Sequence, residues 1–137
     1  MTREEIMAME AGRLLDSQVG KLVFGNVVMY NPDGAPTETS RFLMVVNGVE
    51  RPLPRFSTDI AAAWEVVRAV LDLRWAPPDP RHRGGMTDTS ILYDPYRGQW
   101  ECIFSWSDDT RVVGSDAAAP LAICRAALLA TLAKEPA

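Results

Sequence analysis

The stretch Phe56-Ser57-Thr58-Asp59-Ile60-Ala61-Ala62-Ala63-Trp64-Glu65-Val66-Val67 decides the fold of this chain. Ser57 or Thr58 is expected to cap a helix here, and the Asp59 carboxylate falls in the first turn, where it favours the helix dipole. Apolar residues at helical spacing predict one buried stripe, made of Ile60, Trp64, Val67 and Leu71. The helix is expected to end near Trp75, because a pair of prolines follows it.

A second helix is predicted near the C-terminus, from about Ala119 to Lys134. Pro120 suits its first turn, where the missing amide proton costs nothing. At the other end of the chain, Thr2-Arg3-Glu4-Glu5 matches a capping box and predicts a short helix that breaks near Gly12. A further helix is expected over residues 13–24, followed by a left-handed glycine at position 25.

Runs rich in β-branched and aromatic residues predict strands at 27–30, 42–46, 90–93, 99–106 and 110–113. The segments 31–34, 47–48 and 94–98 are turn signals, and the last of them predicts a hairpin. Alternation over residues 99–106 places four side chains on one face: Trp100, Cys102, Phe104 and Trp106. Trp64 and Trp100 are expected in the core.

The order of these elements predicts an α+β fold. Helices should pack on an antiparallel sheet in αββαβββα order, with α/β/α sandwich-like layers. With 137 residues, the chain is expected to form a single domain over residues 1–137.

The composition argues against several classes of protein. A net charge of −4 disfavours a binder of duplex nucleic acid. No apolar run approaches the ~20 residues that span a bilayer, and the N-terminus does not read as a signal peptide, so a cytoplasmic protein is expected. Cys102 and Cys124 are expected to be buried free thiols, with a disulfide or metal role as the alternative. His82 cannot complete a zinc site with them, and no metal or cofactor is expected.

Two segments could contact an anionic ligand. Arg55 and the hydroxyls of Ser57 and Thr58 open the central helix, and helix starts bind anions; the alternative is a cap alone. The loop 77–88 contains Arg81-His82-Arg83-Gly84-Gly85, a cluster of positive charge that could fold over such a ligand or remain a solvated loop.

Aromatic side chains near the ends of elements could cover a nucleotide base. Trp75 and Trp106 are expected to be half exposed, and Tyr96 and Arg97 lie at the predicted hairpin tip. Arg125, in an apolar helix, is expected to have a structural role, with a subunit or ligand contact as the alternative. The residues predicted to bind ligand are Arg55, Ser57, Thr58, Trp75, Arg81, His82, Arg83, Tyr96, Arg97 and Trp106.

Residues 1–25, 53–67 and 119–129 together resemble the phage ABA sandwich domain, a small family from phage and prophage genomes. The chain departs from the family at Lys21-Leu22, where Glu-Lys is commoner. The resemblance implies a phage origin and helix–sheet–helix layering, and it brings no catalytic residues.

These observations predict a phage-encoded binding protein without catalysis, acting in the host cytoplasm in counter-defence. Its ligand would be a nucleotide-derived immune signal, a cyclic nucleotide, with arginines on the phosphates and aromatic rings on the bases. A pocket shared between subunits would require a homo-oligomer. The alternatives are an inhibitor that binds a host defence protein and a phage accessory or regulatory protein.

Overall fold

The computed structural model describes residues 1–31, 35–72, 86–106 and 111–134. Its elements, in chain order, are α1 (Arg3–Ala8), α2 (Arg13–Leu22), β1 (Val27–Asn31), β2 (Arg41–Val46), β3 (Val49–Pro52), α3 (Ile60–Asp72), β4 (Met86–Asp94), β5 (Gln99–Trp106), β6 (Arg111–Asp116) and α4 (Ala119–Lys134). The helices therefore lie close to the predicted positions, except that the helix expected over residues 13–24 ends at Leu22. The predicted end of the central helix, near Trp75, lies outside the described residues. The Thr2 hydroxyl accepts a hydrogen bond of 3.1 Å from the Glu5 amide, which confirms the predicted cap of α1.

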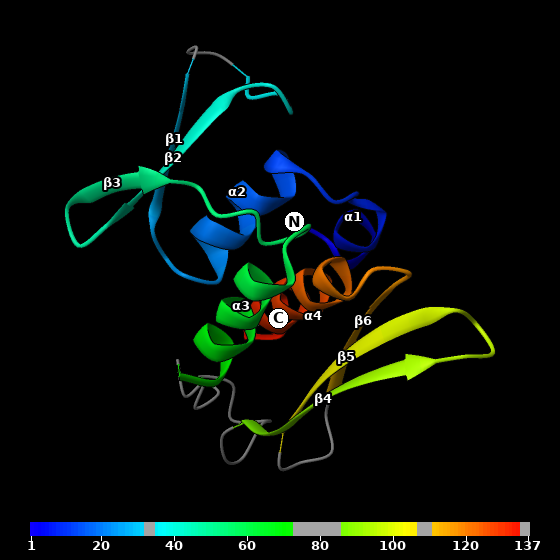
Figure 1. Cartoon of the computed structure of the whole chain (residues 1–137). Helices are drawn as coiled ribbons and strands as arrows, with labels where there is room; N and C mark the ends of the chain where they lie inside the picture. Colours follow the sequence, from blue (N-terminus) through cyan, green and yellow to red (C-terminus); the bar gives the residue numbers. More distant parts are fainter. Residues whose placement is uncertain (32–34, 73–85, 107–110, 135–137) are drawn as a thin grey trace.

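The strands form two antiparallel sheets with the helices between them (Figure 1). Sheet A has the order β1-β2-β3 and sheet B the order β4-β5-β6, so each is a simple meander. The predicted α+β class is confirmed, and helices do pack on antiparallel strands. The strands do not share one sheet, however, and β3 is a strand that the sequence analysis missed.

Strand β3 forms because Asn47 and Gly48 reverse the chain tightly. Both have positive φ, 51° and 80°, which is the backbone of the turns that match the twist of a hairpin. The turn brings Val49 opposite Val46 and continues the pairing to Pro52 opposite Leu43. Pro52 is tolerated because β3 is an edge strand.

Helix α4 lies at the centre of the molecule. It contacts β5 and β6 of sheet B on one side and α1, α2 and α3 on the other. Its residues 121–130 are buried on every side except at Arg125, which is half-buried. A helix that is apolar all round belongs in a core, so α4 connects the two halves of the fold.

Helix α3 packs on α4 with a different face from the one predicted. Its buried residues are Ala63, Val66, Val67 and Val70. Ile60, Trp64 and Leu71 are 46%, 53% and 40% exposed, so the predicted stripe is wrong at these positions and Trp64 is not a core residue. An apolar helix offers two stripes at helical spacing, and the one with smaller side chains lies against α4.

Helix α2 covers the inner face of sheet A. Gly20 makes this possible, because an added Cβ would lie 3.1 Å from the Val28 side chain and 3.3 Å from that of Leu53. A glycine inside a helix costs about 1 kcal/mol relative to alanine, and here it allows the helix to approach the strands. Gly25 then has the predicted positive φ, 68°, where the chain turns into β1.

Sheet B confirms the predicted alternation in β5. Cys102, Phe104 and Trp106 are buried, in a sheet that α4 covers through β5 and β6. Trp100 is half-buried instead of lying in the core, and its ring centre is 5.2 Å from that of Tyr93 on β4.

Candidate functional site

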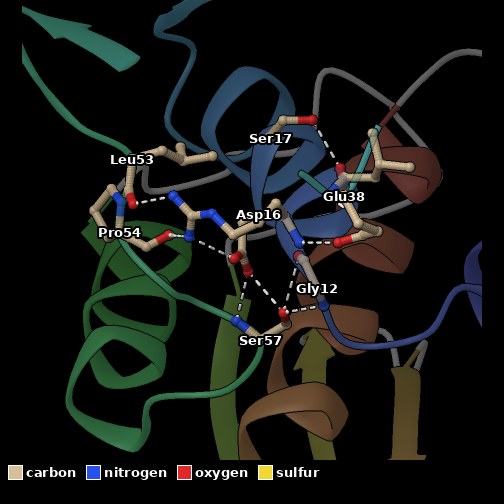
Figure 2. Close-up of polar contacts among 9 residues, drawn as sticks. Gly12, Asp16, Ser17, Glu38, Leu53, Pro54 and Ser57 are labelled. Carbon is tan, nitrogen blue, oxygen red and sulfur yellow. Dashed lines mark hydrogen bonds and ion pairs between the residues drawn. The ribbon is translucent and has the colours of Figure 1, made fainter. Parts of the chain in front are cut away.

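A buried polar network joins the start of α2 to the segment before α3 (Figure 2). The Ser57 amide and hydroxyl both donate to Asp16 Oδ1, at 2.8 and 2.7 Å. The Gly12 amide donates to the Ser57 hydroxyl at 2.9 Å. Asp16 and Ser57 are each 1% exposed. A hydroxyl–carboxylate pair so deeply buried cannot meet a substrate, and it acts as a structural brace.

Arg13 and Glu38 extend this network towards solvent. Arg13 pairs with Asp16 Oδ2 at 2.9 Å and donates to the carbonyl oxygens of Leu53 and Pro54, at 2.5 and 3.3 Å. The Glu38 carboxylate accepts from the amides of Arg13 and Leu14, at 2.6 and 3.3 Å. Amides at the start of a helix need such partners, and a carboxylate there favours the dipole. Glu38 thus caps α2 from a distant loop.

Burial raises the pKa of Asp16 above its ordinary value of 3.8, although hydrogen bonds from Ser57 and the charge of Arg13 lower it in part. The desolvation of the carboxylate is the larger effect, as expected inside a core.

The start of α3 differs from the predicted one in the residue that caps it. The Ser57 hydroxyl is already bonded to Asp16, and the cap of α3 is Asp59, whose carboxylate accepts from the Ala61 amide at 3.0 Å. Both predicted cap residues, Ser57 and Thr58, precede the true cap. A loop turn explains the shift, because the Thr58 and Asp59 amides donate to the Arg55 carbonyl oxygen.

Arg125 has the structural role that was predicted. Its guanidinium donates to the Ser115 carbonyl oxygen at 2.8 Å and to the Met9 carbonyl oxygen at 2.9 Å, and it lies 3.3 Å from Asp116 Oδ1. It therefore ties α4 to the end of β6 and to the end of α1. Its Nε is buried without a partner.

The two thiols are buried and free, as predicted. Burial raises the pKa of Cys102 to about 12 and raises that of Cys124 as well. A thiol in this state is a poor nucleophile, because the thiolate is the reactive form. The described residues include no group of three or more side chains placed to hold a metal ion.

Among the predicted ligand residues that the structure describes, those before α3 and those on the β4–β5 hairpin lie apart (Figure 1). Arg55 and Thr58 are exposed on the segment before α3. Tyr96 and Arg97 are exposed at the tip of the β4–β5 hairpin, which projects away from that segment (Figure 1). Arg97 lies 3.9 Å from Glu101. Their binding roles remain predictions.

Trp106 is only 4% exposed, so the half-exposed ring expected there is wrong. The alternation of β5 points this side chain into the core, and that constraint outweighs its place at the end of the strand. Trp75, Arg81, His82 and Arg83 lie outside the described residues.

A pocket on sheet A was not predicted from the sequence. It lies on sheet A, has a volume of about 360 Å³, and is lined by Met29, Tyr30, Asn31, Arg41 and Leu43. The β1–β2 register places Asn31 opposite Arg41 and Met29 opposite Leu43. Directly opposed residues share one face of a sheet, so these four side chains lie together. Both strands were predicted, but their register depends on the long connection between them.

A smaller pocket of about 250 Å³ is lined by Arg3, Arg111, Val112, Val113 and Leu129. Of the predicted ligand residues within the described part of the chain, none lines either of these two pockets.

The fold belongs to the α+β class, with a layer of helices between two antiparallel three-stranded meanders. The family model for the phage ABA sandwich domain matches residues 19–128, and the chain belongs to that family. The resemblance seen in the sequence is thereby confirmed. Comparison with curated proteins and with solved structures finds no match. Among the described helices, none is long and apolar enough to cross a membrane.

Proposed function

We propose that this phage-family protein is a non-catalytic binding protein that sequesters a nucleotide-derived signal, a cyclic nucleotide, in counter-defence within the host cytoplasm. The observation that carries the proposal is the pocket on sheet A, whose 360 Å³ lies in the range of small-ligand sites. The deeply buried Asp16–Ser57 pair and the protonated thiols support binding over catalysis.

The side chains of the pocket suit an anionic ligand with an apolar body. The Arg41 guanidinium can pair with a phosphate through two hydrogen bonds, and the described residues offer it no carboxylate partner. Met29 and Leu43 supply an apolar wall for a base, and the Asn31 amide can donate to or accept from the edge of the base.

The test is to incubate the purified protein with cyclic mono- and dinucleotides, remove free ligand, heat the protein and analyse what is released by chromatography. Intact nucleotide is the expected result. A degraded nucleotide would show an enzyme instead, and release of nothing would reject the proposal.

Arg41→Ala is expected to weaken nucleotide binding by about 10- to 100-fold, because a hydrogen bond to a charged group contributes about 1.5–3 kcal/mol. Arg51→Ala is the matched control: Arg51 is an exposed arginine of the same sheet, on β3, and does not line the pocket. Isothermal titration calorimetry on both variants checks this. Equal losses in the two variants would show a general charge effect and place the ligand elsewhere.

The second candidate is a protein-binding inhibitor of a host defence effector, and the exposed face of α3 favours it. Trp64 is 53% exposed between Ile60 and Leu71, with Glu65 and Arg68 beside it. An exposed tryptophan among apolar residues is typical of an interface anchor. We expect Trp64→Ala to abolish the recovery of a stoichiometric host protein in pull-downs, whereas Arg41→Ala would not. If Arg41→Ala abolished the recovery and Trp64→Ala did not, the pocket on sheet A would be the favoured binding site instead of the exposed face of α3.

A further inference from the structure

The two edges of sheet A differ in how well they are protected against pairing with another strand. Edge strand β3 consists of Val49, Glu50, Arg51 and Pro52, so it carries two charges and a proline. Natural edge strands use such residues to prevent association. Edge strand β1 reads Val-Val-Met-Tyr-Asn, with no charge, no proline and no register shift against β2.

Strand β1 is also accessible. Sheet A projects from the layer of helices (Figure 1), and among the described strands only β2 pairs with β1. Val27 is 64% exposed and Met29 44%. Exposed apolar side chains beside an unpaired row of backbone amides and carbonyls form a template for strand addition.

We propose that two copies of this chain pair through β1, antiparallel about a two-fold axis at Met29, and join their A sheets into one six-stranded sheet. A second copy fits this edge because the strand is complementary to itself. With Met29 opposite its equivalent, Val28 of one copy faces Tyr30 of the other, and Val27 faces Asn31. Aromatic and β-branched residues are a favourable cross-strand pair, and the pairing buries no charge.

The pairing also completes the pocket of sheet A. Met29 and Asn31 line that pocket from β1, and the second copy would add its own Val27 and Met29 to the same outer face. Each pocket would then be shared between two chains. The dimer itself stands independently of what the pocket binds.

The mass in solution tests the pairing without any ligand. We expect light scattering after size exclusion to give twice the 15.1 kDa of the chain for the wild type, over a range of concentrations. Val27→Lys should give a monomer, because it places a charge on the β1 edge, at a position that does not line the pocket of the single chain. Val49→Lys places the same charge on the opposite edge and should remain a dimer. A monomeric wild type, or equal behaviour of the two variants, would overturn the proposal.

A cross-linking experiment does not depend on how well Val27→Lys folds. Directly opposed residues of antiparallel strands have Cα atoms about 4.5–5.5 Å apart, within the range of a disulfide. Met29→Cys should therefore form a disulfide-linked dimer on mild oxidation, whereas Val49→Cys should not, and the two native thiols are buried. Failure of Met29→Cys to cross-link would exclude this register. If the wild type were a monomer that bound cyclic nucleotide, the proposed dimer would be rejected and the proposed function would stand. If it were a dimer that bound no cyclic nucleotide, the proposed function would be rejected and the dimer would stand.

Discussion

Gly114→Ala is expected to destabilise the protein by about 3 kcal/mol, and Gly114→Val to prevent stable folding. Gly114 lies on β6 opposite Cys102, where α4 crosses sheet B. An added Cβ would overlap the Ala122 carbonyl oxygen and the Ala126 amide nitrogen, and would lie 2.9 Å from the Ala126 Cα. These are backbone atoms of a buried helix, so no side chain can rotate away and α4 would have to move off the sheet.

Overpacking a core costs about 1–3 kcal/mol and occasionally more, and small domains have only about 5–15 kcal/mol in total. Urea unfolding followed by circular dichroism measures the loss. Gly25→Ala is one control. Its added Cβ meets nothing within 4 Å, so only the positive φ should lower the free energy of unfolding, by about 1–2 kcal/mol. Ser115→Ala, the next residue of β6, should change stability by less than about 0.5 kcal/mol. A Gly114→Ala protein as stable as the Ser115→Ala protein would contradict the close approach.

Asp16→Ala is expected to lower the free energy of unfolding by about 3–5 kcal/mol, the usual cost of removing one partner from a buried ion pair. The substitution leaves the buried Ser57 amide without its acceptor and the Arg13 guanidinium without its carboxylate partner. Glu38→Ala is the matched control, because it removes an exposed carboxylate from the same helix start and should cost only about 1 kcal/mol. Equal losses in the two variants, measured by urea unfolding, would show that burial of Asp16 does not matter.

Asp16 should also make the free energy of unfolding depend on pH, with a sign that follows from its raised pKa. The pKa of Asp16 is raised in the folded protein, so the folded state binds this proton more tightly than the unfolded chain does. Its contribution is therefore fully present below pH 3.8 and is lost as the pH rises through the folded pKa. The stability difference between the wild type and Asp16→Asn, which does not titrate, should shrink between pH 3.5 and 7. A difference that grew with pH would mean that Arg13 and Ser57 outweigh desolvation.

Much of the local structure follows from the sequence because it depends on neighbouring residues. The Thr2 cap, the alternation that buries Cys102 and Phe104, and the long apolar helix that begins near Pro120 are all present as predicted. The family was also recognisable, since the segments that carry it are contiguous runs within or beside these elements.

The candidate site was harder to predict. The pocket depends on the β1–β2 register that sets Asn31 opposite Arg41, two residues separated by a long connection. Ser57 and Trp106 carry groups that could bind a nucleotide, as predicted, but both side chains are buried in the core. Burial of this kind depends on partners distant in the chain: Asp16 is the partner of Ser57, 41 residues away.

The sequence by itself determined the helices and every strand except β3, because capping, alternation and turn chemistry act over a few residues. Only the tertiary structure decided that the strands form two sheets, that α3 turns Ala63 instead of Trp64 towards α4, and that Asp16 is buried. The physical reason is that each of these choices has a locally equivalent alternative. Close packing of α4 against α3 and sheet B, and the pairing of buried polar groups, select one of them.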